Sequence, residues 1–367
     1  MQNRQLIEIY VVEIQDLLRR GEYAKCYARA KDTLSLCENT AIESETRRRL
    51  TVLAAKSAYS VSRFDEALAL CEAAEELLGT VNLPSRHRYS FECALIRANM
   101  LRRQGKLHEA LAVIERHEGE VSAGVSPELV SEKLLIEGAC RFYLDELPRA
   151  EESLEAALGI AIQHGDSRVK ARVLTMLGLV AQRKGLHEAA LEFLNRAKEI
   201  CRVNGDRYGE AAAALNTGIL LYRRGRFSSA ARNVERARAI FESIEWRIGV
   251  CRSLLAEGNI ARCRGDFAAA VRFYRDAGRL AEGNGFARER ALACEFMGDV
   301  HFERARYEAA ERCYREGLAI AASMAPAGDI VVEINRRLGE LYLSREEVSS
   351  ALPILRAALR LSVRLDD

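Results

Sequence analysis

Small residues return at a fixed spacing along the chain. One series recurs five times in succession at a spacing of 40 residues, and two further series run twelve residues upstream and seven residues downstream of it. The first is Cys26, Ala67, Ala110, Ala150, Ala190, Ala230, Ala270, Ala310 and Ala351; the upstream series is Ile14, Ala55, Ala98, Gly138, Gly178, Gly218, Gly258, Gly298 and Gly339; the downstream series is Thr33, Ala74, His117, Ala157, Ala197, Ala237, Ala277, Gly317 and Ala358. Small residues at fixed offsets indicate closely packed helices, and a long fixed period indicates one supersecondary unit stacked on copies of itself.

The hydrophobic pattern inside one period predicts two helices. Apolar residues at helical spacing favour a first helix over 168–184 and a second over 187–202. Asp166 stands where a cap for the first helix belongs, Gly185 separates the two helices, and Gly205 with Asp206 forms the next loop. Each period is therefore a helix–turn–helix.

The whole chain predicts an all-α solenoid of about nine such repeats. No alternating strand segment of convincing length is present, and proline is rare. The expected boundaries are a degenerate first repeat at 1–45 and further repeats at 46–89, 90–128, 129–167, 168–206, 207–246, 247–286, 287–328 and 329–367.

The turn between the paired helices carries a second recurring signature. Glycine stands at Gly21, Gly105, Gly185, Gly225 and Gly265, often with an aromatic residue two positions later and the small-residue series three beyond that. This combination resembles the tetratricopeptide repeat (TPR) family, and the 40-residue period resembles the extended repeats of spindle-orientation adaptors and of bacterial TPR-containing regulators. The resemblance implies a right-handed superhelix whose first helices line a concave face. It also implies a non-enzymatic protein that binds a peptide or protein partner there.

Composition and charge exclude several other classes. The net charge of +2 gives no general attraction to nucleic acid or to an anionic membrane, so nucleic acid is an unlikely partner. No signal peptide or membrane-spanning run is present, and ten scattered cysteines without metal-ligand spacing indicate packing residues in a reducing cytoplasm. No motif suggests a catalytic residue, a metal or a cofactor, and His187 and His301 occupy repeat positions. Trp246 occupies the repeated position of the loop between successive repeats. We expect it either to pack between two repeats or to be exposed as an anchor for a partner.

The repeat register also predicts which side chains line the concave face. Counted from the upstream series, one face of each first helix carries basic and aromatic residues in the early and middle repeats. The predicted partner-binding groove consists of Lys56, Tyr59, Asn99, Arg102, Arg103, Tyr143, Arg172, Arg183, Tyr222, Arg223, Arg252, Asn259 and Arg262. The equivalent positions of the last two repeats are mostly acidic and include Glu295, Asp299, Glu303, Glu333 and Glu340. The basic stretch suits an acidic or carboxylate-ended peptide; a merely solvated wall is the alternative.

Two functional hypotheses follow. The first is a scaffold that binds a peptide or protein in the concave groove, in signalling or regulation. The second is a sensing or autoinhibitory module of a larger transcription regulator or effector. The apolar stripe of the last helix, with Leu352, Leu355 and Leu359, lacks a following polar cap. It predicts either that the chain is the N-terminal part of a longer protein or that it self-associates through the C-terminal repeat.

Overall fold

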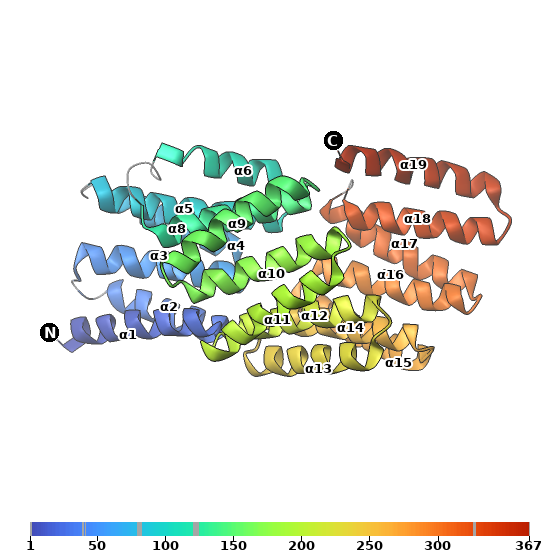
Figure 1. The fold of residues 1–367 in the computed structure, drawn as a ribbon, viewed down its shortest axis with the longest axis horizontal. Helices are drawn as coiled ribbons and strands as arrows, with labels where there is room; N and C mark the ends of the chain where they lie inside the picture. The colour runs from blue at the N-terminus through green and yellow to red at the C-terminus, as the bar shows by residue number, and fades with distance from the viewer. Residues whose placement is uncertain are drawn as a thin grey trace. The chain divides into compact units, whose positions relative to one another are not determined.

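The computed structural model describes residues 2–38, 40, 42–78, 83–119, 125–325 and 328–366. The regular structure in these ranges is α-helical and comprises eighteen helices (Figure 1). They are α1 (Gln2–Arg20), α2 (Tyr23–Glu38), α3 (Ser44–Ser60), α4 (Phe64–Glu76), α5 (Leu83–Arg103), α6 (Leu107–Glu115), α8 (Pro127–Tyr143), α9 (Leu147–Gln163), α10 (Ser167–Arg183), α11 (His187–Val203), α12 (Arg207–Arg223), α13 (Phe227–Ser243), α14 (Arg247–Cys263), α15 (Phe267–Asn284), α16 (Ala287–Glu303), α17 (Tyr307–Met324), α18 (Asp329–Ser344) and α19 (Val348–Asp366). The predicted all-α fold of paired helices is confirmed. None of the helices in the described ranges is long and apolar enough to cross a bilayer.

The ends of α10 follow the predicted start and stop chemistry. The Asp166 carboxylate accepts hydrogen bonds from the backbone N–H groups of Arg168 and Val169, at 3.0 and 2.9 Å, and so caps α10. At the turn between α10 and α11, Gly185 has φ of +78°, a conformation that costs glycine little. The same turn position is occupied in other pairs by Ser62, Asp145, Ala305 and Glu346, which also have positive φ. The turn geometry is thus kept where glycine is absent.

Glycine in the first helix of a pair allows close contact with the second. A Cβ atom added to Gly178 would lie 2.9 Å from Leu194, and one added to Gly258 would lie 2.3 Å from the Tyr274 ring. Ala230 is completely buried, and a Cβ on Gly218 would lie 3.1 Å from its carbonyl oxygen. The small-residue series therefore mark the contact between paired helices.

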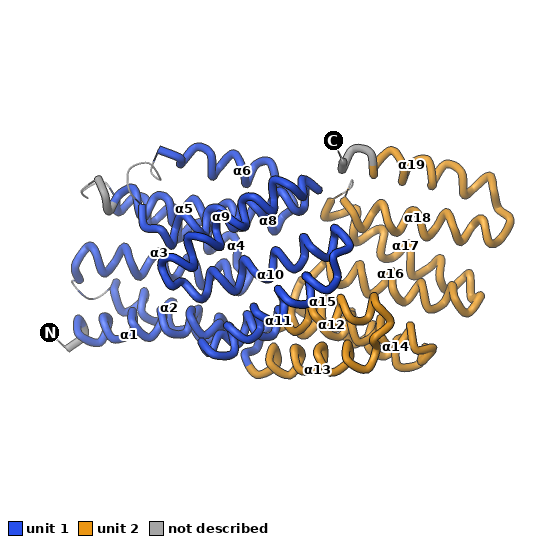
Figure 2. The backbone as a smooth tube through the Cα atoms, viewed as in Figure 1, with its two compact units in different colours: residues 1–213, 244–246 blue, residues 214–243, 247–367 orange. Residues whose placement is uncertain are grey.

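The chain divides into two compact units (Figure 2). Unit 1 comprises residues 1–213 and 244–246, and unit 2 comprises residues 214–243 and 247–367. Within unit 1 the first helices of successive pairs contact one another, α1 with α3, α3 with α5, α5 with α8 and α8 with α10; within unit 2, α14 contacts α16 and α16 contacts α18. We call the first helix of each pair helix A, and the surface that these helices form within one unit its helix-A face.

Unit 1 also contains a contact between segments far apart in sequence. Tyr23, Tyr208 and Trp246 form an edge-to-face aromatic triad, with ring centroids 5.1, 5.6 and 5.3 Å apart. A Cβ on Gly21 would lie 2.6 Å from the Cβ of Tyr208, so glycine is required for this approach. Trp246 is 7% exposed and is a packing residue of unit 1, in agreement with the predicted packing between repeats.

Candidate functional site: the helix-A faces

An ion cluster occupies the helix-A face of unit 1. Lys56 on α3 binds Glu92 on α5 at 2.6 Å, and Arg172 on α10 binds Glu132 on α8 at 2.9 Å. Arg88 adds a second cation to Glu92, at 3.1 Å. We call Lys56, Arg88, Glu92, Glu132 and Arg172 the unit 1 ion cluster. Its members come from four helices that contact one another in series, which is how the repeat brings them together.

The electrostatics of this cluster show an excess of positive charge. Burial alone would raise the pKa of Glu132, but Arg172, Lys56 and Arg168 outweigh it and lower the pKa to about 2. For Glu92 the effect of burial is likewise outweighed by Lys56 and Arg88, and its pKa is lowered. Four cations, counting the exposed Arg168, thus act on three carboxylates, because Arg168 and Arg172 also act on Asp206; four minus three leaves one positive charge. Such a surface favours a further anion.

Arginine and aromatic side chains lie together beside this cluster. The Arg103 guanidinium lies 4.5 Å from the centre of the Tyr59 ring, and the Arg183 guanidinium lies 5.0 Å from that of Phe142. Arg183 also binds Asp145 at 3.0 Å, although both side chains are at least half exposed. These stacked guanidinium groups are held in place yet remain open to solvent.

The remaining predicted residues of unit 1 differ in exposure. Asn99 is buried; its amide nitrogen donates to the Leu95 carbonyl, and its side-chain oxygen accepts from Arg102 at 3.3 Å. Tyr143, in contrast, is 54% exposed. Asn99 therefore acts mainly within the fold, whereas Tyr143 is available to a ligand.

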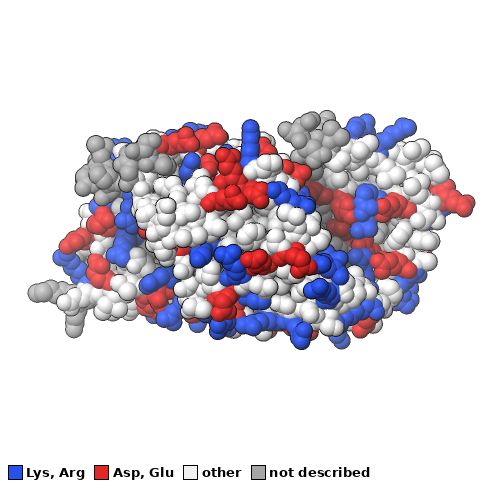
Figure 3. Space-filling view, viewed as in Figure 1, with Lys and Arg blue, Asp and Glu red and all other residues white. Residues whose placement is uncertain are grey.

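Two of the five predicted residues of unit 2, Arg252 and Arg262, have partners on the next helix A. Arg252 binds Glu289 at 2.8 Å, and Arg262 binds Asp299 at 2.8 Å. Asn259 accepts a hydrogen bond from the Tyr274 hydroxyl at 2.7 Å. Tyr222 is half-buried and Arg223 is exposed. Charged residues of both signs are interspersed over the visible surface (Figure 3).

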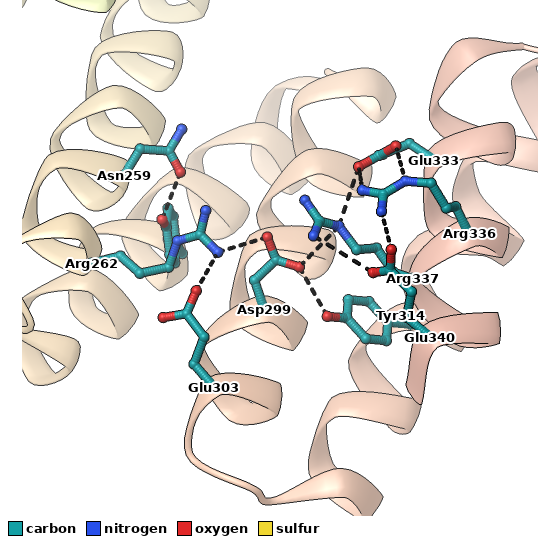
Figure 4. Close-up of polar contacts among 10 residues, drawn as sticks. Asn259, Arg262, Asp299, Glu303, Tyr314, Glu333, Arg336, Arg337 and Glu340 are labelled. Atoms are coloured by element: carbon teal, nitrogen blue, oxygen red, sulfur yellow. Dashed lines mark hydrogen bonds and ion pairs between the residues drawn. The ribbon is translucent and has the colours of Figure 1, made fainter. Parts of the chain in front are cut away.

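The acidic end predicted for the helix-A face lies in unit 2. Asp299 is 3% exposed and receives hydrogen bonds from Arg262 and from the Tyr314 hydroxyl, with Arg337 at 3.4 Å (Figure 4). Glu333 binds both Arg336 and Arg337. This group links α14, α16, α17 and α18.

Sequence reasoning missed two features of these faces. It identified Arg172, Lys56 and Arg252 but not their carboxylate partners Glu132, Glu92 and Glu289, which lie 36 to 40 residues away in the chain. The sequence signal that could have identified these pairs is a charge of opposite sign about one repeat period away. Arg168 was also not predicted as a site residue; it is the first residue of the predicted helix 168–184 and has no distinguishing sequence feature.

No group of three or more His, Cys, Asp or Glu side chains is placed to hold a metal ion in the described part of the chain.

Residues 169–243 match the family model described as the tetratricopeptide repeat. Among curated proteins, none matches the chain. Solved structures share its fold. A Rap protein complexed with Competence and Sporulation Factor is 15% identical with a TM-score of 0.71, over 98% of this chain and 99% of that one. The Rap conjugation gene regulator of the plasmid pLS20, in complex with the Phr* peptide, is 13% identical with a TM-score of 0.63, over 98% and 96%.

A third similar structure belongs to a longer chain. It is the Signal Transduction ATPase with Numerous Domains (STAND) protein with a tetratricopeptide repeat sensor from Pyrococcus horikoshii, 15% identical with a TM-score of 0.62, over 98% of this chain and 55% of that one. At these identities the likeness shows a shared TPR solenoid fold.

Proposed function

We propose that this chain is a regulatory TPR protein that binds a peptide, or a peptide segment of a partner protein, on its helix-A face. The observation that carries the proposal is the positive excess at the unit 1 ion cluster, where Lys56, Arg88, Arg168 and Arg172 act on three carboxylates, Glu92, Glu132 and Asp206. Solved structures of similar fold are described as complexes with a peptide or with a sporulation factor. An acidic or carboxylate-ended peptide is the ligand class that this surface favours.

Existing ion pairs shape how such a peptide would bind. Arg172 and Lys56 already have carboxylate partners, so a ligand carboxylate must share or displace these. Arg168 and Arg183 are exposed, so binding a ligand carboxylate costs them little existing interaction energy. We therefore expect these two arginines to contribute most of the electrostatic affinity and Tyr143 to offer an exposed ring.

The experiment is a selection of linear hexapeptides from a display library, followed by titration of the enriched peptides by fluorescence anisotropy. The test variant combines Arg168→Glu with Arg183→Glu, and the matched control combines Arg196→Glu with Arg202→Glu on α11, the second helix of its pair. Both variants change the charge equally. We expect the test variant to weaken binding at least about tenfold, because attraction becomes repulsion, and the control to bind like the wild type. Failure to enrich any peptide, or equal affinities of the two variants, would contradict the proposal.

The sensor of a larger regulator remains a second candidate. The observation that favours it is the likeness to a STAND protein whose chain extends well beyond the matched part. The complete gene decides between the candidates, since an ATPase or DNA-binding domain in the same reading frame selects the sensor. That the chain catalyses no reaction and takes no cofactor stays a prediction.

A further inference from the structure

One buried carboxyl group in unit 2 has no partner in the fold. Glu295 on α16 is 3% exposed, and no hydrogen bond or ion pair to its carboxyl is found among the described residues. Buried acidic groups are normally paired, because removing a charge from water is costly. Other carboxylates of the same helix have partners: Glu289 binds Arg252, and Asp299 binds Arg262.

The surroundings of Glu295 are mainly acidic. Asp299 lies one turn along on α16, and the charges of Glu333, Asp329 and the cation Arg337 act on Glu295 from α18. Tyr314 on α17 also faces Glu295. Arg262 on α14 binds Asp299 (Figure 4). The charge of Asp299 also acts on Tyr274 on α15. Each cation of this group already binds another carboxylate.

The balance of charge leaves this region short of cations. Six carboxyl groups, Glu295, Asp299, Glu303, Asp329, Glu333 and Glu340, stand against four guanidinium groups, Arg262, Arg288, Arg336 and Arg337. Six minus four leaves an excess of two negative charges when every carboxyl is ionised. Burial, and then the charges of Asp299 and Glu333, raise the pKa of Glu295 to about 8.

The group has a buried floor and a more exposed rim. Glu295 and Asp299 are each 3% exposed, whereas Glu303, Glu333 and Glu340 at the rim are 38 to 42% exposed. Among the described residues of this group, the Glu295 carboxyl is buried beside these carboxylates and receives no hydrogen bond. We call Glu295, Asp299 and Glu333 the acidic recess.

We propose that the acidic recess binds a cationic group of the ligand, a guanidinium or an ammonium, with Glu295 as its principal acceptor. The inference rests on the proposed function, since the cation is expected on a peptide or partner segment that binds the helix-A face of unit 2. A guanidinium fits well because its several N–H donors can satisfy Glu295 and Glu333 together. The cation also removes the local excess of negative charge.

Binding is expected to be coupled to loss of a proton. A cation binds the ionised form of Glu295, so below the pKa of the free recess each bound cation releases one proton. The apparent affinity should therefore rise about tenfold per pH unit up to about pH 7.5 and level off above pH 8.5, as linkage requires for a pKa of about 8.

The test uses small probes. Nα-acetyl-arginine amide and Nα-acetyl-lysine amide carry the two cations, and Nα-acetyl-citrulline amide is a neutral isostere of the first. Each is titrated into the full chain while amide NMR shifts of α16 and α18 are followed at pH 6.5, 7.5 and 8.5. We expect saturable shifts around residues 295–299 and 333–337 with a cationic probe and none with citrulline. The two cationic arms show which cation is preferred.

Variants assign the effect to Glu295. Glu295→Gln keeps the size of the side chain and loses no partner, so its thermal unfolding midpoint should equal or exceed that of the wild type. It should weaken cation binding at pH 8.5 at least tenfold and abolish the pH dependence. Glu340→Gln at the rim, 41% exposed, is the matched control and should change affinity less than about threefold, because a partly exposed charge contributes little.

The outcomes separate this inference from the proposed function. Equal binding of the arginine and citrulline probes, or full affinity of Glu295→Gln, would overturn the acidic recess. Selected hexapeptides that bind unit 1, together with cationic probes that shift no resonance around residues 295–299, would overturn the acidic recess and leave the proposed function intact. Cation binding at Glu295 without any enriched peptide would support the acidic recess and contradict the proposed function.

Discussion

Positive φ at the turns between paired helices is a property of single residues with a measurable cost. Ala305 has φ of +52° at the position where Gly185 has +78°. An L side chain in this region destabilises the folded state by about 1–2 kcal/mol. Replacing it with glycine removes this cost but also increases the conformational entropy of the unfolded chain, which offsets about 0.4–1 kcal/mol. We expect Ala305→Gly to stabilise the protein by about 0.5–1 kcal/mol, measured by denaturant unfolding.

The reverse substitution is the control for that prediction. A Cβ on Gly185 would meet nothing within 4 Å, so Gly185→Ala changes only the backbone preference. It should destabilise by a similar amount. A stabilised Gly185→Ala variant, or an Ala305→Gly variant less stable than the wild type, would show that turn conformation is not the limiting factor.

At the scale of helices, the contact between paired helices depends on an absent side chain. A Cβ on Gly258 would lie 2.3 Å from the Tyr274 ring, and the Tyr274 hydroxyl is itself held by Asn259. Gly258→Ala should therefore force α14 and α15 apart and cost about 1–3 kcal/mol, as overpacking does. Thermal unfolding followed by circular dichroism measures this.

Gly278 on α15 supplies the matched control. A Cβ there would meet only the Ala293 Cβ, at 3.7 Å, an ordinary contact. Gly278→Ala should be neutral or stabilising by up to about 1 kcal/mol, because alanine is the better helix former. If both alanine variants behaved alike, the upstream glycine series would reflect something other than helix contact.

The helices themselves were predictable from sequence. The predicted spans 168–184 and 187–202 differ by one residue from α10 (Ser167–Arg183) and α11 (His187–Val203). The reason is local: Asp166 as a cap and Gly185 at a positive φ define the ends by nearest-neighbour chemistry. Because the repeats share one pattern, a helix pair predicted in one repeat predicts the equivalent pair in the others.

The pairing of charges was less predictable. The register correctly grouped Lys56 with Arg172 as side chains of helix A, but it did not show that each already binds a carboxylate of the neighbouring helix A. Such contacts depend on the offset between stacked repeats, which one-dimensional periodicity does not contain. Glu295 was likewise predicted as an acidic face residue, whereas its burial without a partner follows only from the three-dimensional packing.

At the scale of a whole unit, contacts between distant segments escape the repeat pattern altogether. The aromatic triad of Tyr23, Tyr208 and Trp246 joins the first helix pair to a junction much later in the chain. Trp246 stands where other repeats have aspartate in the loop between repeats. This replacement indicated unusual packing at that loop but did not identify the residues that Trp246 contacts. Curvature accumulated over several repeats determines such a contact, and the sequence period does not specify that curvature.

The last helix raises the question of self-association, which stays a prediction. Val348, Leu352 and Leu359 on α19 are 51, 45 and 66% exposed, and their spacing places them along one face of the helix. Leu355 packs against Gly339 and contributes to the core of unit 2, so the exposed stripe is shorter than the sequence suggested. Full burial of one such side chain is worth about 1.5–3 kcal/mol, and two copies that bury this stripe gain only part of it for each side chain. That gain must also exceed the free-energy cost of association.

We therefore expect weak association, detectable by light scattering only at about 100 μM or above. The combined variant Leu352→Glu and Leu359→Glu should remain monomeric at those concentrations with an unchanged unfolding midpoint, because both side chains are exposed and their loss costs the fold little. Val203 on α11, 70% exposed and alone, is the control position: Val203→Glu should leave any association unchanged. A wild-type chain that stays monomeric at several hundred micromolar would rule out association through α19, and association abolished equally by Val203→Glu would place it elsewhere.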